Sequence, residues 1–337
     1  MTDTDATASA VNSDDRATAH LPRPASGWSA LTDRVIVRVS GPGTEPFLQG
    51  QFSQNLTEVI SSRSLRAAAS TPKGRAYCLT RLVRDGDDIL FDLPTALADP
   101  TMAHLKKYLM LFRGTTASQV PESRILGLFG TDTASVLAGD RISELTAPGD
   151  TLSTDYGRLI RVEPTSDGLA RFELWALTAE SPLSADSERP LADWHAAEIA
   201  AGIASLSSET QEQFVPQMLN WQHVGGVHFK KGCYTGQEVI ARMHFLGQLK
   251  KSLFRFAVEQ APALPLPGSS LLSEDRSVGT VVNSVRYENG SVELLAVVRH
   301  DARLDDLHAE ATPDQKLERR PLPYAVPEQN PPVKTDT

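Results

Sequence analysis

The residues best suited to chemistry lie between Phe229 and Glu238, where the sequence reads Phe-Lys-Lys-Gly-Cys-Tyr-Thr-Gly-Gln-Glu. This stretch combines two cations, a thiol, a phenol, a carboxamide and a carboxylate, with glycines at Gly232 and Gly236. The pattern after Gly236 is typical of a helix start, whose free N–H groups would face the preceding loop. The spacing therefore predicts an anion-binding loop that carries a thiol.

Cys233 is the candidate working residue of this stretch. Lys230, Lys231 and the predicted helix start each favour the thiolate over the thiol. The alternative is a small buried cysteine whose neighbours merely close a turn, which is a common role for an isolated cysteine. The functional interpretation is favoured by the other polar residues of the stretch, which are Tyr234, Gln237 and Glu238.

A metal site formed by the residues of this chain alone is not expected. Cys78 and Cys233 are the two cysteines, whereas an intrinsic iron–sulfur cluster needs about four. The histidines at 223, 228 and 244 lack a tight ligand spacing, so they are interpreted as surface or loop residues. Nucleophilic triads and phosphate loops of the Walker type are also missing, which gives hydrolases and NTPases no support.

Composition bounds the class of protein. The chain has 337 residues, 40% of them hydrophobic, and a net charge of −9, so it can bury a large core but lacks a general basic field for nucleic acid. A local basic patch remains open. With no apolar leader and no apolar stretch of about 20 residues, we expect a cytoplasmic protein that neither enters a membrane nor needs disulfides, and that is a monomer.

Hydrophobic periodicity and turn residues predict alternating strands and helices. Strands are expected at 34–40, 75–84, 88–93, 124–129, 159–162 and 171–176, and β-rich runs at 253–258, 279–285 and 291–298. Helices are expected at 45–55, 95–112, 131–138, 190–202 and after Gly236. The prediction is a flexible tail over 1–26, two α+β subdomains over 27–115 and 116–250, a small antiparallel barrel over 251–317 and a proline-rich extension over 318–337.

At Lys231–Glu238 the sequence resembles the YgfZ-type folate-binding family, relatives of the glycine-cleavage aminomethyltransferase (T-protein) that support iron–sulfur enzymes. The resemblance covers nearly all of residues 30 to 325. It extends through the following segments: Phe47–Gln51, Pro72–Arg75, Leu105–Tyr108, Phe214–Gln217 with Asn220, Gly225–Phe229 and Pro321–Tyr324.

This resemblance implies an α+β fold of the T-protein type, with two α+β subdomains and a C-terminal antiparallel β-barrel around a central channel that takes tetrahydrofolate. It implies that Trp194, Gln217 and Asn220 border the folate. Trp194 could instead be an ordinary helix-packing residue. The motif glycines Gly232 and Gly236 would let backbone approach a ligand closely.

The sequence departs from the family pattern at several positions. Arg34 stands where a second channel tryptophan is expected, Met218 stands where relatives often carry an acidic residue, and Ser53–Asn55 differs from the usual Thr and Asp. In the aminomethyltransferase an aspartate near the first glycine-rich loop moves the proton, but Tyr77–Thr80 holds no carboxylate. Classical aminomethyl transfer is therefore not expected.

Three functions stay open at this point. The first is a folate-binding accessory factor that works with the iron–sulfur assembly machinery and its client enzymes, including radical enzymes that modify tRNA. The second is a folate-dependent one-carbon transferase or demethylase. The third is a non-catalytic interaction protein in which the loop at Cys233 is only a turn.

Overall fold

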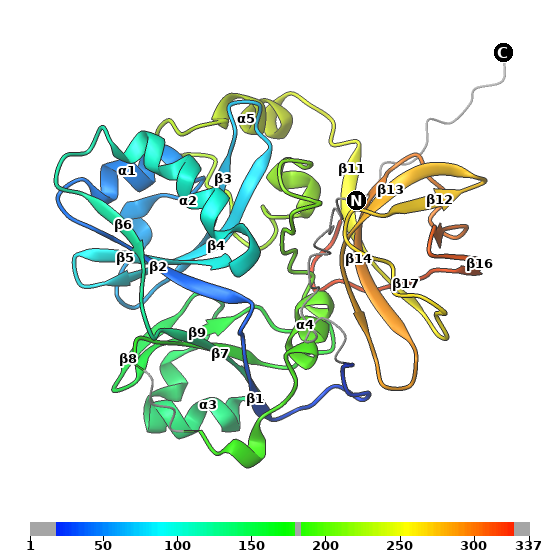
Figure 1. The fold of residues 1–337 in the computed structure, drawn as a ribbon, viewed down its shortest axis with the longest axis horizontal. Coiled ribbons are helices and arrows are strands. Elements are labelled where there is room, and N and C mark those ends of the chain that lie inside the picture. The colour runs from blue at the N-terminus through cyan, green and yellow to red at the C-terminus, as the bar shows by residue number, and fades with distance from the viewer. Residues whose placement is uncertain (1–17, 179–182, 327–337) are drawn as a thin grey trace, which may run out of the picture.

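The computed structural model describes residues 18–178 and 183–326, and these form three antiparallel β-sheets (Figure 1). Two sheets have five strands each, and the third has seven strands and curls into a half-barrel. In Figure 1 the two smaller sheets lie one above the other, and the half-barrel stands beside both of them. No helix within the described ranges is long and apolar enough to cross a bilayer.

The first sheet has the strand order β3-β4-β5-β2-β6. Its core gathers apolar side chains from these strands and from helices α1 and α2, such as Phe47, Phe91 and Leu105. A two-residue turn with Gly86 at φ +65 joins β4 to β5, which fits the predicted hairpin. The elements are β2 (Arg34–Ser40), α1 (Thr44–Gln51), η2 (Leu56–Glu58), β3 (Leu65–Ser70), β4 (Ala76–Asp85), β5 (Asp88–Pro94), α2 (Thr95–Leu109) and β6 (Thr116–Gln119).

The second sheet has the strand order β1-β7-β10-β9-β8. Helix α3 covers one face of it, with Ala134 against Leu128 and Phe172 in one apolar cluster. The elements are β1 (Gly27–Ala30), β7 (Arg124–Phe129), α3 (Thr131–Ala138), η3 (Gly139–Glu144), β8 (Thr151–Thr154), β9 (Gly157–Val162), β10 (Arg171–Ala176) and η4 (Ala185–Ser187). The chain then continues to the half-barrel through α4 (Leu191–Ala200), η5 (Pro216–Leu219) and α5 (Gln237–Phe245).

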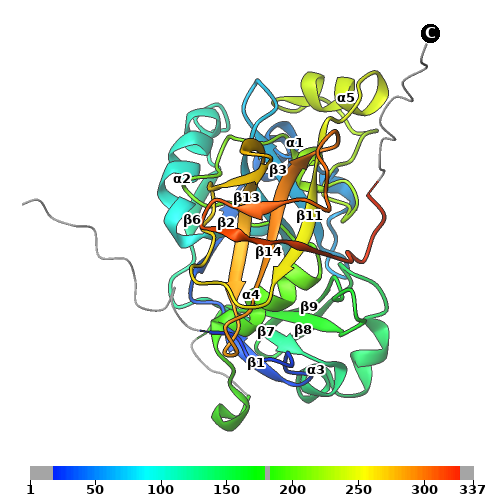
Figure 2. The ribbon, with the colours of Figure 1, turned by 90° about the vertical axis from the view of Figure 1, so that its right-hand side faces the viewer.

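The half-barrel has the strand order β16-β15-β12-β13-β14-β11-β17, and its long strands stand in the foreground of Figure 2. Helix α4 joins it to the rest of the molecule, because Ala196 and Ile199 share an apolar cluster with Val282 and Leu295. The strands are β11 (Lys251–Val258), β12 (Ser270–Ser273), β13 (Arg276–Arg286), β14 (Val292–Arg299), β15 (His308–Ala309), β16 (Thr312–Lys316) and β17 (Glu318–Arg320).

The predicted division near residue 115 does not match the sheets. Strand β1, placed by sequence in the first subdomain, pairs with β7 of the second sheet. Strand β6, placed in the second subdomain, pairs with β2 of the first sheet. Each sheet thus takes an edge strand from the other stretch of chain, and pairing between distant strands is not written in local sequence patterns.

The predicted tails are also shorter than expected. Ala19 is fully buried and bridges to Tyr287, and the carboxylate of Asp193 accepts from the N–H and the ring Nδ1 of His20. The flexible-tail prediction is therefore wrong for residues 18–26, while 1–17 lie outside the described residues. At the other end β17 pairs with β11, so the proline-rich extension is packed at least to residue 320, and 327–337 lie outside the described residues.

Candidate functional site

The segment Lys230–Gly236, called the motif loop below, lies against the C-terminal end of α1. The N–H of Thr235 donates to the carbonyl oxygen of Gly50 at 3.0 Å. The last carbonyls of a helix have no partner within the helix, so this contact satisfies one of them. The motif loop is therefore held by α1 of the first sheet.

Lys231 strengthens the same contact. Its Nζ donates to the carbonyl oxygens of Gln49 and Phe52, at 2.6 Å each, and lies 4.8 Å from the ring centre of Tyr234. Burial lowers the pKa of Lys231 to about 8, whereas the carbonyl oxygens and the negative end of the α1 dipole favour the ammonium. Burial also raises the pKa of Tyr234 to about 12. The structure gives Lys231 the role of a cap on α1.

Cys233 is an exposed free thiol on this loop. The alternative of a small buried cysteine is therefore wrong for Cys233. It describes Cys78 instead, which is buried in β4 and whose thiol pKa is raised by burial. Open space surrounds the neighbouring Gly232, so the backbone beside the thiol is also accessible.

The loop ends where α5 begins, and Gly236 is the residue at that junction. Its φ of +82 is a left-handed conformation that favours glycine, and a Cβ there would lie 2.6 Å from the carbonyl oxygen of Thr71. The side chain of Gln237 accepts from the N–H of Tyr234 at 3.2 Å. Glu238 is exposed in the first turn of α5, where a carboxylate interacts favourably with the helix dipole.

Gln217 and Asn220, predicted to border folate, hold other elements together in the structure. Asn220 adopts φ +57 and exchanges two hydrogen bonds with the backbone of Leu253 in β11. Gln217 donates from Nε2 to the carbonyl oxygen of Ile240 in α5 at 2.7 Å, and its Oε1 is buried with no partner among the described residues. Asn220 is thus occupied structurally, while Gln217 keeps one acceptor available.

Trp194 is fully buried in α4, between the second sheet and the cluster of charges described next. The guanidinium of Arg171 lies 4.7 Å from the ring centre, and Gly127 leaves room for the ring because a Cβ there would overlap it. The faces of the indole are therefore covered by protein. Its N–H, however, is buried with no partner among the described residues.

Eight buried or nearly buried charged side chains form an ionic cluster between the first and second sheets. Arg34 reaches Glu198 at 2.5 Å and Glu173 at 3.4 Å. On the other side, Arg66 and Arg81 both bind Glu163, and despite burial these two cations hold the pKa of Glu163 below its usual range. The members of the ionic cluster are Arg34, Arg66, Arg81, Asp92, Glu163, Arg171, Glu173 and Glu198.

Arg171 differs from the other cations of the ionic cluster. Its Nε donates to the carbonyl oxygen of Glu163, but Nη1 and Nη2 have no partner among the described residues. The side chain is fully buried, and burial lowers its pKa to about 10. A buried donor without an acceptor costs about 1–3 kcal/mol, so these nitrogens mark a place where an acceptor is missing.

Sequence reasoning missed the ionic cluster except for Arg34. A usable signal was a charge in the middle of an apolar strand, as at Arg81 in β4 and Glu173 in β10. Asp92 in β5 is another example, and its Oδ1 accepts from the hydroxyl of Thr80 at 2.9 Å. The carboxylate of Asp92 thus lies beside Tyr77–Thr80, the segment of β4 that has no carboxylate of its own. This carboxylate already accepts hydrogen bonds from the hydroxyl of Thr80 and the N–H of Arg81.

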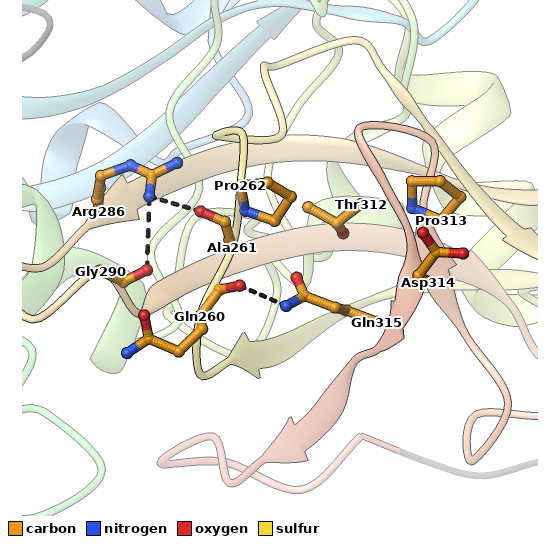
Figure 3. A pocket seen from close by; sticks show the side chains of 9 residues that line it. All are labelled: Gln260, Ala261, Pro262, Arg286, Gly290, Thr312, Pro313, Asp314 and Gln315. Atoms are coloured by element: carbon orange, nitrogen blue, oxygen red, sulfur yellow. Dashed lines mark hydrogen bonds between the residues drawn. The ribbon is translucent and has the colours of Figure 1, made fainter.

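Figure 3 shows a separate pocket of about 450 Å³ on the half-barrel. Arg286 at its edge donates to the carbonyl oxygen of Ala261 at 2.7 Å. None of the residues that line it is a predicted site residue. Across residues 18–178 and 183–326, no three His, Cys, Asp or Glu side chains gather as a metal site would require.

Comparison with known proteins places this chain among named relatives, although no family model matches it. It is 31% identical over 309 residues to the tRNA-modifying protein YgfZ of Shigella dysenteriae serotype 1, covering 88% of this chain and 93% of that protein. The same values hold for the tRNA-modifying protein YgfZ of Escherichia coli strain K12 / DH10B. The chain belongs to the YgfZ family.

The fold of this YgfZ-family chain is that of the T-protein. The aminomethyltransferase T of the glycine cleavage system from Bartonella henselae superposes with a TM-score of 0.69 at 17% identity, covering 92% of this chain and 88% of that chain. The predicted fold class is therefore confirmed, with the barrel present as the curled seven-stranded sheet. At this identity the likeness establishes the fold alone.

Proposed function

We propose that this protein is a folate-binding accessory factor that supports the assembly or repair of iron–sulfur proteins, including radical enzymes that modify tRNA. The observation that carries the proposal is the exposed thiol of Cys233 on a loop fixed to α1. The names of its relatives, tRNA-modifying proteins, support the class of process. The proposed setting is the cytoplasm, and the proposed partners are the assembly machinery and its client enzymes.

Cys233 is the proposed contact with those partners. An exposed sulfur can meet a cluster, a persulfide or a partner thiol without opening the fold. Because Lys231 and Thr235 donate to carbonyl oxygens at the end of α1, the loop is held on both sides of Cys233. Ordering a flexible loop at the moment of contact would cost free energy, and a loop already held avoids that cost.

Tetrahydrofolate is the proposed ligand of the interior. The observation that fits it is the pair of unpartnered donors, the N–H of Trp194 and the Nη groups of Arg171. Folate carries carbonyl and carboxylate oxygens, which are the acceptors that such donors need. Gln217 would add an acceptor through its free Oε1. These residues would bind and orient folate through hydrogen bonds rather than by stacking.

The role of Cys233 is tested by complementation of a strain that lacks its own YgfZ-family gene. Cys233→Ser and Cys233→Ala are expected to fold normally and to fail to restore iron–sulfur enzyme activity. Cys78→Ala is the matched control, since it removes the buried thiol and leaves the loop unchanged. Full rescue by both Cys233 variants would remove the thiol from the mechanism.

Folate binding is tested separately by titrating tetrahydrofolate while following tryptophan fluorescence. A saturable change is expected, and Trp194→Phe, which keeps an aromatic side chain but replaces the indole by a smaller ring without the N–H, should weaken binding about 5- to 10-fold, the value of one hydrogen bond. Isothermal calorimetry on the same variant gives a readout that does not depend on the lost fluorophore. A flat titration with the wild-type chain would favour a non-catalytic interaction protein instead.

A further inference from the structure

Four exposed cations near the motif loop make no salt bridge among the described residues, although Lys250 interacts electrostatically with Asp301. Acidic residues outnumber basic ones by 42 to 33 in the chain as a whole, whereas the stretch from Lys230 to Lys250 reverses that balance. Glu238 is the one exposed acid in the stretch from Lys230 to Lys250. The four cations are Lys73, Lys230, Arg242 and Lys250.

These cations come from elements that touch. Lys73 lies in the turn between β3 and β4, and Gly74 of that turn packs so closely on α5 that a Cβ would lie 2.8 Å from the Cβ of Val239. Lys230 follows Phe229, whose ring stacks on His244 of α5 with centroids 3.6 Å apart. Figures 1 and 2 both place α5 and the β3–β4 turn at the same end of the molecule.

Exposed rings accompany the charges. Phe245 is 63% exposed at the end of α5, and its ring lies 4.7 Å from that of His244, which is also exposed. Large apolar side chains that stay in water favour contact with another molecule. Cations and rings together form what we call the α5 edge, which consists of Lys73, Lys230, Arg242, His244, Phe245 and Lys250.

We propose that the α5 edge binds single-stranded RNA. Unpaired Lys and Arg side chains neutralise phosphates, and exposed aromatic rings stack on unpaired bases. The overall charge of −9 disfavours non-specific binding of RNA to the surface as a whole. The choice of RNA over DNA rests on the proposed function. A strand bound at the α5 edge would lie beside the motif loop and Cys233.

The test is fluorescence anisotropy with a labelled single-stranded RNA of about twelve nucleotides and the full-length wild-type chain. If four phosphates are neutralised, raising the salt from about 50 to about 200 mM should weaken binding roughly 50-fold. Phe245→Ala is expected to weaken binding about 10-fold through lost stacking. The double variant Arg242→Gln, Lys250→Gln should make the logarithmic salt slope shallower by about 1.4.

Matched controls lie on the half-barrel. Leu266 is as exposed as Phe245, at 62% against 63%, and Arg276 is an exposed cation, so Leu266→Ala and Arg276→Gln should leave RNA binding unchanged. No binding by the wild-type chain up to about 100 µM at low salt would overturn the proposal. If polyglutamate bound as tightly as the RNA, the proposal would also be overturned, since the edge would then be a docking site for acidic protein. If DNA of the same sequence bound as tightly as the RNA, the choice of RNA would be overturned.

The outcome is separable from that of the proposed function. Phe245→Ala and the Arg242, Lys250 double variant should keep the wild-type response to tetrahydrofolate, because the unpartnered donors of Trp194 and Arg171 are buried in the interior. Loss of RNA binding with normal folate binding supports the proposal. If the wild-type chain restored iron–sulfur enzyme activity in the complementation test but bound no RNA, the RNA proposal would be overturned and the proposed role of Cys233 would stand.

Discussion

Lys230 and Lys231 are neighbours in sequence with opposite environments. Lys230 is exposed, whereas Lys231 is 8% exposed and caps α1 through two carbonyl oxygens. A strand or loop turns successive side chains to different sides, so adjacent cations can serve solvent and core separately. The difference gives each lysine its own measurable consequence.

Replacing Lys231 with methionine is expected to lower the free energy of unfolding by about 1–3 kcal/mol, because two α1 carbonyls lose their donor. Urea unfolding followed by circular dichroism measures it. Lys230→Met is the matched control and should change that free energy little. Equal losses in the two variants would contradict the capping role.

The pH dependence of stability follows from the same residue. The pKa of Lys231 is lowered from 10.5 to about 8 in the folded protein, so the unfolded chain binds more protons between these values. The wild type is therefore expected to gain stability relative to Lys231→Met as the pH rises from about 8 towards 10.5. Parallel stability curves for the two proteins over this range would show that the carbonyl oxygens keep the ammonium at its ordinary pKa.

At the scale of elements, the motif loop and the β3–β4 turn form one unit joined through glycine. Gly236 packs on Thr71, and Gly74 packs on α5. Gly232, in contrast, faces open space, and a Cβ added there would meet no atom within 4 Å. The two motif glycines, which look equivalent in the sequence, thus have different physical roles.

Gly236→Ala is expected to destabilise the protein by about 1–3 kcal/mol, since it combines a strained left-handed backbone with an overlap on the Thr71 carbonyl. The loop should also loosen, so alkylation of Cys233 by iodoacetamide should change in rate. Gly232→Ala is the matched control, with no clash and little loss of stability. A Gly236→Ala variant as stable as Gly232→Ala would contradict the packing described for the turn.

At the scale of the whole molecule, the ionic cluster joins the first two sheets together with an apolar cluster that includes Ile36 and Leu90 of the first sheet and Ile160 of the second. Arg66 and Arg81 come from the first sheet, and Glu163 comes from the chain after β9 of the second. Removing one partner of a buried ion pair leaves the others uncompensated, which costs far more than the pair contributes when complete. The sheets therefore depend on the complete set of charges.

Glu163→Gln is expected to lower the free energy of unfolding by about 3–5 kcal/mol, since Arg66 and Arg81 would lose the one carboxylate that both of them bind directly. Thermal and urea unfolding measure the loss. Glu144→Gln breaks an ion pair with Arg141 that lies on the surface, and it should leave the unfolding free energy nearly unchanged. A small effect at Glu163 would mean that the two arginines have other partners.

Acid should act through the same residue. Because the pKa of Glu163 is held below its usual value of 4.5, its contribution to stability is present above pH 4.5 and is lost as the pH falls further. Wild-type stability should therefore drop more steeply below pH 4.5 than that of Glu163→Gln. Identical acid transitions in the two proteins would contradict this assignment.

Local sequence patterns predicted most of the helices and the long strands. The predicted helix at 131–138 coincides with α3, and the hairpin about Gly86 and the strand at 34–40 appear as β4–β5 and β2. These features depend on periodicity and turn residues within a few positions of one another, which a sequence displays directly. Strands β1 and β6 could not be assigned to their sheets this way, since an edge strand pairs with whichever distant partner the fold brings to it.

What the sequence determined by itself was the chemistry of the motif loop: a thiol, lysines and glycines before a helix start, arranged in one short stretch. The tertiary structure alone decided which of them are buried and which are exposed, with Lys231 packed on α1 and Cys233 in solvent. It also decided that the ring of Trp194 is buried while its N–H has no partner among the described residues, and that Arg34 belongs to an ionic cluster. The reason is physical: burial and pairing are set by residues far away along the chain, whereas residue type and turn propensity are local.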